Sequence, residues 1–254
     1  MPDPPAEATA ETPTRTTAEE ALPRTPVILF WARNRLLLTE ATYMVNDVWA
    51  GDKSNPGDED PRKHVDSWLD RGVIPLDWAG GNVYLDREVE DLARKWSSKF
   101  EAGHYGIAID EFGWNSKKEM RKIRDTLAVV RENRPHGFIA VWHIGLLNDL
   151  YCEMYKQYVD LVLLESYFPA VSLRFLINFD TNVRLARENG ISTKCVFALG
   201  LDPNKWLRSP EAAKKRMVFI KENAPEMPGI AFFAPRISAD FMLAVEKIAA
   251  TLYK

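Results

Sequence analysis

The sequence contains few of the residues that mark several common protein classes. Only two of its 254 residues are cysteines, Cys152 and Cys195, and they do not form a CxxC pair. A dense disulfide framework or a cysteine zinc site is therefore not indicated, and we expect two buried thiols. The four histidines show neither HxH nor HExxH spacing, which argues against a zinc hydrolase site.

Excess basic charge and long apolar segments are also absent. The formal net charge is -3 and the pI is about 5.9, so the basic surface typical of nucleic-acid-binding proteins is not expected. No apolar run approaches the roughly 18 residues of a membrane span. The nucleotide-binding patterns GxGxxG and GxxxxGK[ST] and the nucleophile-elbow pattern GxSxG are missing as well. We predict no nucleic-acid partner, no membrane span and no cofactor.

The first 24 residues differ in composition from the rest of the chain. They are rich in Pro, Ala, Thr and Glu and contain almost no large apolar side chains. Such a segment cannot bury enough surface to offset the entropy lost on ordering. The composition predicts a disordered tail or linker over 1–24 and one domain over 25–254. The tail has no apolar signal-peptide core but is similar to the spacer that often follows one, so we expect a secreted or periplasmic protein if a signal peptide was removed before Met1.

From residue 27 onward, short apolar runs alternate with amphipathic segments. Near-continuous apolar runs are typical of parallel strands that are buried on both faces. After the first gap, the starts lie 24 to 34 residues apart, which is about the length of one strand–helix unit. The seven runs cover 27–32, 73–78, 106–111, 137–143, 161–166, 195–200 and 229–234.

The interval between the first two runs has room for an eighth strand, within residues 36–49. Eight strand–helix units and a length of about 250 residues are typical of one closed α/β barrel. We therefore predict a (β/α)8 TIM barrel that is irregular near its first strands. A doubly wound open sheet is the alternative.

Polar side chains end several of these runs. Asp77, Asp110 and Glu165 are each the fifth residue of a run, Glu111 follows Asp110, and His143 closes another run. The carboxyl ends of parallel strands carry the site in α/β barrels, and buried carboxylates are costly unless they are paired or used. We interpret Asp110, Glu111 and Glu165 as catalytic, and Asp77 and His143 as substrate-binding. A turn or helix cap is the alternative role for Asp77.

The apolar neighbours of Glu165 favour the role of general acid, because desolvation raises the pKa of a carboxyl. Asp110 is then the expected nucleophile or base. Aromatic side chains also lie at or just beyond the strand ends, where their flat faces are suited to sugar rings. The predicted substrate-binding aromatics are Trp31, Trp78, Trp114, Trp142 and Tyr167.

Two stretches, GIAIDEFGW (106–114) and DLVLLESYF (160–168), resemble the barrel glycosidases related to endo-α-1,4-polygalactosaminidase, glycoside hydrolase family 114. Asp110 matches the first acidic position of that family and Glu165 the second. The resemblance implies a TIM barrel that hydrolyses glycosidic bonds in a carbohydrate substrate.

Two other functions remain open. One is a metal-dependent barrel isomerase or hydrolase, since strand-end carboxylates are suitable ligands for Mg²⁺ or Mn²⁺. Its candidate ligands are Asp77, Asp110, Glu111, Glu165 and Asp202. The other is a carbohydrate-binding barrel without catalytic activity, which the same aromatic side chains would serve.

Overall fold

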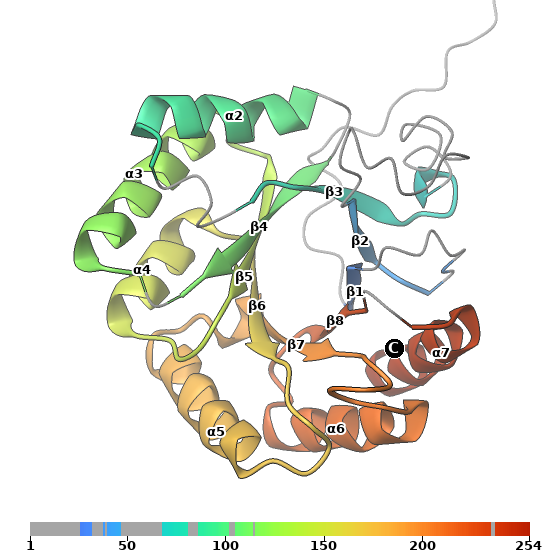
Figure 1. Cartoon of the computed structure of the whole chain (residues 1–254). Helices are drawn as coiled ribbons and strands as arrows, with labels where there is room; N and C mark the ends of the chain where they lie inside the picture. Colours follow the sequence, from blue (N-terminus) through green and yellow to red (C-terminus); the bar gives the residue numbers. More distant parts are fainter. Residues whose placement is uncertain are drawn as a thin grey trace, which may run out of the picture.

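The fold is a closed barrel of eight parallel strands. The computed structural model of the chain describes residues 26–31, 38, 40–46, 68–80, 86–101, 105–113, 115–234 and 237–254. The strands follow one another around the barrel in chain order, and the last pairs with the first (Figure 1). The predicted (β/α)8 barrel is therefore confirmed. The predicted tail, residues 1–24, lies outside the described residues.

The strands agree closely with the apolar runs of the sequence. The eighth strand, expected within 36–49, is β2 and pairs with β1 and β3. The eight strands are β1 (Val27–Trp31), β2 (Tyr43–Asn46), β3 (Ile74–Trp78), β4 (Gly106–Phe112), β5 (Phe138–His143), β6 (Leu161–Ser166), β7 (Cys195–Gly200) and β8 (Gly229–Phe233).

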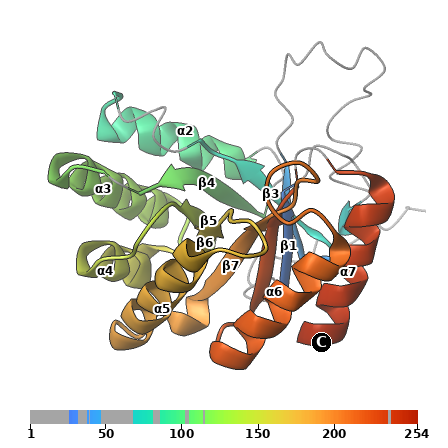
Figure 2. The same ribbon diagram turned by 60° about the horizontal axis from the view of Figure 1, so that its bottom comes forward.

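From β3 onward, one α-helix follows each strand, and these helices lie around the outside of the barrel (Figures 1 and 2). None of the helices in the described residues is both long and apolar enough to cross a membrane. The helices are α2 (Val89–Glu101), α3 (Lys117–Asn133), α4 (Asp149–Tyr158), α5 (Leu173–Glu188), α6 (Pro210–Asn223) and α7 (Ala239–Tyr253), with a short 3₁₀ helix η3 (Ser192–Lys194) before β7.

Serine and asparagine side chains fix where several of these helices begin. Ser116 accepts a hydrogen bond from the backbone N–H of Glu119, and the Glu119 carboxylate accepts one from the Ser116 backbone, which forms a capping box. Asn148, Ser172 and Ser209 cap α4, α5 and α6 in the simpler way. Each of these caps ends the loop that leaves the carboxyl end of a strand. The loop is therefore held by the strand at one end and by the capped helix at the other.

The strands carry two separate apolar layers because side chains alternate between their faces. Leu29, Leu76 and Leu163 belong to the cluster that fills the lumen of the barrel. Residues one position away, such as Phe30 and Leu164, belong to the cluster that packs against the helices. Both cysteines are free and buried, as expected. The face to which a strand residue points thus decides whether it can reach the lumen.

Candidate active site

The mouth of the lumen, at the carboxyl ends of the strands, brings together two of the three predicted catalytic carboxylates with aromatic side chains. Asp110 lies two residues after the lumen residue Ala108 of β4, so it is on the same face of the strand. Glu165 lies two residues after the lumen residue Leu163 of β6. The indole Nε1–H of Trp78, from β3, donates a hydrogen bond to Oδ2 of Asp110 over 3.4 Å. Glu165, Asp110 and Trp78 are all partly buried.

The adjacent acids Asp110 and Glu111 lie on a bulge in β4. Ile109 pairs with Val141 and Phe112 with His143, so the two acids together lie opposite the single residue Trp142. Glu111 has a φ of 59°, a left-handed backbone conformation that is costly for a residue with a side chain. The bulge brings the exposed Glu111 beside Asp110 at the end of the strand, where regular alternation would turn it to the helix side.

The chain just after the bulge is held in one conformation. Gly113 has a φ of 155°, and a Cβ atom there would overlap the backbone carbonyl of Ile144. The backbone N–H of Gly113 donates to Oδ1 of Asn115, which also accepts from the hydroxyl of Tyr151 on α4 over 2.8 Å. The Tyr151 hydroxyl in turn accepts from the Asn115 backbone N–H over 3.2 Å. This network connects the acidic bulge to a helix.

Burial, followed by the negative charges of Asp110 and Glu111, raises the pKa of Glu165 to about 7. Within the described residues, no hydrogen bond or ion pair to the Glu165 carboxyl offsets this effect. A carboxyl with a pKa near 7 is substantially protonated at neutral pH and can donate its proton. Asp110 and Glu111 therefore lie close enough to favour the protonated form of Glu165.

An aromatic cluster surrounds these carboxylates. The indole Nε1–H of Trp142 donates to the hydroxyl of Tyr167 over 2.7 Å, and Trp142 packs edge-on against Trp31. Burial, followed by the charges of Glu165 and Asp110, raises the pKa of Tyr167. Trp31 and Trp142 are only 6% and 1% exposed, so they form a floor beneath the partly exposed Trp78 and Tyr167.

Two members of this cluster were not predicted from the sequence. Phe233, on β8, stacks on Tyr167 with 5.3 Å between ring centroids, and Trp206 lies 4.9 Å from the same ring. Phe233 is recognisable in the sequence by alternation, because it lies two residues beyond the lumen residue Ala231. Trp206 lies in the loop after β7, and no local pattern in the sequence predicts its contact.

Asp77 and His143, which were predicted to bind substrate, are not brought to the lumen. Asp77 points to the helix side of β3 and forms a 3.0 Å ion pair with Lys99 of α2. His143 is fully buried on the helix side of β5, where its Nδ1 lies 2.9 Å from the hydroxyl of Tyr155. Burial lowers the pKa of His143 to about 4. Both residues lie at strand ends, but on the face opposite Trp78 and Trp142.

Two further predictions concern Trp114 and metal ions. Trp114 lies outside the described residues. Within the part of the chain that the structure describes, no group of three or more His, Cys, Asp or Glu side chains is arranged to hold a metal ion.

Comparisons with known proteins agree with the architecture. No family model matches the chain, and neither does any curated protein. Among solved structures, a GH18 chitinase from Cycas revoluta, in complex with (GlcNAc)3, has a TM-score of 0.63 and 10% identity, over 89% of this chain and 99% of that one.

Two other solved structures with this fold are also enzymes. The spore cortex-lytic enzyme SleL of Bacillus cereus has a TM-score of 0.64 and 10% identity, over 91% of this chain and 74% of that one. An endo-beta-N-acetylglucosaminidase from Cordyceps militaris has a TM-score of 0.57 and 9% identity, over 91% and 92%. At these identities the likeness shows the shared barrel fold. None of the three is described as a family 114 enzyme, so the resemblance to that family stays a prediction.

Proposed function

We propose that the protein is a glycoside hydrolase that cleaves an oligosaccharide or polysaccharide at the mouth of the barrel. One observation carries the proposal: a carboxyl group with a pKa of about 7, Glu165, lies beside Asp110 and Glu111 at the carboxyl end of the barrel. Glycoside hydrolysis uses two carboxyl groups with different proton affinities, one as acid and one as nucleophile or base.

In the proposed reaction, protonated Glu165 donates its proton to the glycosidic oxygen as the bond to the leaving sugar breaks. Asp110, which receives a hydrogen bond from Trp78, attacks the anomeric carbon or activates a water molecule. The charge of Glu111, at the exposed end of the bulge, helps to keep Glu165 protonated. The partly exposed rings of Trp78, Tyr167 and Phe233 are suited to the apolar faces of sugar rings.

Oligosaccharides of N-acetylglucosamine are the first substrates to test, because chitinases bound to (GlcNAc)3 and (GlcNAc)4 share the fold. The resemblance to family 114 adds α-1,4-linked galactosamine polymers. The experiment incubates the native protein and the Glu165→Gln and Asp110→Asn variants with both kinds of glycan and measures new reducing ends. We expect cleavage by the native protein only.

The same three proteins, tested also for glycan binding and for activity in the presence of EDTA, separate the two alternative functions. Binding of a glycan without cleavage, equal in the native protein and in both variants, would indicate a carbohydrate-binding barrel. Activity that EDTA abolishes and that Mg²⁺ or Mn²⁺ restores would indicate metal-dependent chemistry. Either result would overturn the proposed acid–base mechanism.

A further inference from the structure

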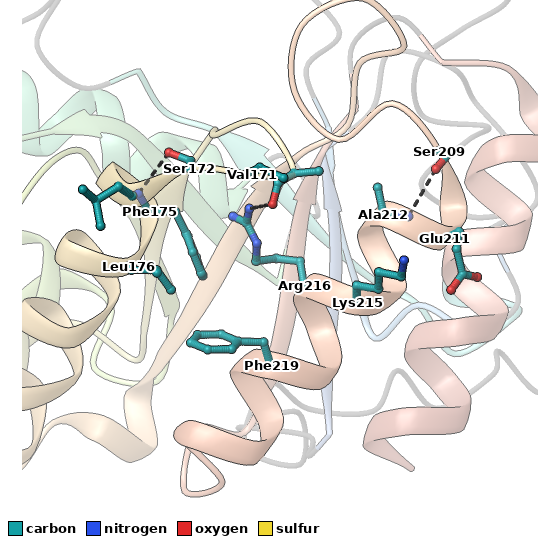
Figure 3. A pocket seen from close by; sticks show the side chains of 12 residues that line it. Val171, Ser172, Phe175, Leu176, Ser209, Glu211, Ala212, Lys215, Arg216 and Phe219 are labelled. Atoms are coloured by element: carbon teal, nitrogen blue, oxygen red, sulfur yellow. Dashed lines mark hydrogen bonds between the residues drawn. The ribbon is translucent and has the colours of Figure 1, made fainter.

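A pocket lies on the outside of the barrel, between the N-terminal parts of α5 and α6. Its volume is about 620 Å³, and its lining combines the loop before α5 with one face of each helix (Figure 3). Val171, Leu173 and Leu176 line one side of the pocket, and Arg216 and Lys215 come from α6. Neither Asp110 nor Glu165 is among its lining residues.

The apolar wall of this pocket is exposed to an unusual degree. Six large apolar side chains are exposed in the described residues, and three of them line the pocket: Val171 at 95%, Leu173 at 73% and Leu176 at 40%. The rings of Phe175 and Phe219 continue the apolar surface inward. Exposed apolar side chains that are gathered around a pocket mark binding sites more often than isolated ones do.

Arg216 gives the pocket a buried positive charge. Its side chain is 5% exposed, and its guanidinium lies 3.6 Å from the centre of the Phe175 ring. Nη2 donates to the backbone carbonyls of Pro169 and Ala170, over 2.8 and 3.1 Å, whereas Nη1 has no hydrogen-bond partner among the described residues. Figure 3 shows the guanidinium beside Phe175, reaching toward this loop.

No carboxylate in the described residues neutralises this charge. Arg216 forms no ion pair there, and burial lowers its pKa to about 10. A buried cation without a counter-ion is costly, and a bound anion would remove much of that cost. The ionisable side chains that line the pocket are Arg216, Lys215 and Glu211, which leave one net positive charge. That charge favours a monoanion over a phosphate dianion.

We propose that the pocket between α5 and α6 binds an organic monoanion: a carboxylate attached to an aromatic or branched aliphatic group. The carboxylate lies against the guanidinium of Arg216, and the apolar group packs on Leu173, Leu176 and Val171. This chemistry is found both in free carboxylic acids and at the C-termini of peptides that end in an apolar residue. The site does not depend on the proposed hydrolase activity.

Calorimetric titration of the full chain with two probes tests the proposal. The probes are 3-phenylpropionate and an acetylated tripeptide that ends in phenylalanine with a free carboxylate. Each is compared with its uncharged amide. We expect saturable binding of at least one acid and binding at least about tenfold weaker for the matching amide. The acid that binds more tightly shows whether the pocket takes a free carboxylic acid or the C-terminus of a peptide. No saturable binding of either acid up to about 10 mM, or equal binding of acid and amide, would overturn the proposal.

Two matched variants locate the binding site. Leu173 lines the pocket, whereas Ile177, on the same helix and 55% exposed, does not. Leu173→Asp should weaken acid binding at least about tenfold by repulsion and loss of apolar contact, and Ile177→Asp should leave it unchanged. Equal loss in both would contradict the proposed position. Arg216→Gln should abolish the preference for acid over amide, and if this variant does not fold, the Leu173 and Ile177 pair still decides.

Discussion

Neighbouring residues on β3 and β5 differ sharply in their surroundings. Trp78 faces the lumen and donates a hydrogen bond to Asp110, whereas Asp77, one residue earlier, pairs with Lys99 on a helix. Trp142 likewise forms the lumen floor, whereas His143 is enclosed on the helix side. Side chains alternate along a strand, so adjacent residues reach different chemical environments.

The two faces differ in whether the charge of an ionisable side chain is compensated by neighbouring groups. On the helix side, neither group leaves an uncompensated charge: Asp77 pairs with a cation, and His143 is neutral beside a tyrosine hydroxyl. On the lumen side, Glu165 faces two other carboxylates, which raise its pKa instead of lowering it. Uncompensated acids of this kind are typical of sites that are used in function. The following predictions test whether activity belongs to the lumen face alone.

The largest expected effect comes from the acid on the lumen face. Glu165→Gln should lower kcat on a cleaved glycan by about 10²–10⁴-fold, because the amide cannot donate a proton to the leaving oxygen. The matched change on the helix side, Asp77→Asn, should alter kcat by less than about threefold, since its carboxylate contacts Lys99 and not the lumen. Steady-state kinetics measure both. Comparable losses in the two variants would show that the face of the strand does not determine the role.

The pH dependence should follow the coupling between Glu165 and Asp110. Activity of the native protein should fall as the pH rises through about 7, because Glu165 then loses its proton. Asp110→Asn removes one charge that raises this pKa, so any residual activity should begin to fall at lower pH. A pH profile of kcat/KM for each protein measures the shift. An unchanged alkaline limb in the variant would indicate that another group titrates.

The stability of the protein should also depend on pH through Glu165. Its pKa is raised from 4.5 to about 7 on folding, so the folded state binds more protons and loses stability as the pH rises from about 4.5 to 7. Glu165→Gln mimics the protonated form and escapes this loss. We expect its Tm to exceed that of the native protein by about 2–4 °C at pH 8, with little difference at pH 4. Calorimetry of the exposed control Glu153→Gln should show no such pattern.

The smallest expected effect concerns the hydrogen bonds between Asn115 and Tyr151 behind the acidic bulge. Tyr151→Phe removes the hydroxyl that donates to Asn115, and should lower the free energy of unfolding by about 1 kcal/mol. Turnover should fall by less than about tenfold, because Asn115 still accepts from Gly113. Tyr158→Phe on the same helix is the control, and denaturant unfolding measures both. A larger effect in Tyr158→Phe would contradict the stabilising role assigned to the hydrogen bonds of Tyr151.

Most of the fold could be predicted from the sequence because each unit carries its own local signal. The apolar runs located seven strands, and the long interval between the first two located the eighth. Helix starts carry local signals as well: Asn148 caps α4, and Ser209 caps α6 with Pro210 at its first position. These signals depend on burial and on hydrogen bonds within a few residues, so they do not require knowledge of the tertiary structure.

The candidate site was less predictable, because the direction in which a side chain points depends on the alternation within each strand. Counting from the start of each run placed Asp77 at the same height as Asp110 and Glu165, but the runs do not all begin on the same face. Strand β3 begins at Ile74, one residue after the apolar run. The contact of Trp206 with Tyr167 joins two loops that are distant in sequence, and no local pattern encodes it.

The bulge in β4 has a consequence for changes in chain length. Glu111 is the extra residue between Asp110, which faces the lumen, and Phe112, which lies on the helix side. Deletion of Glu111 would therefore restore the two-residue period, with Asp110 still facing the lumen and Phe112 still on the helix side, and would remove only the second acid. An acidic pair could be transferred to another strand of this barrel only together with its extra residue.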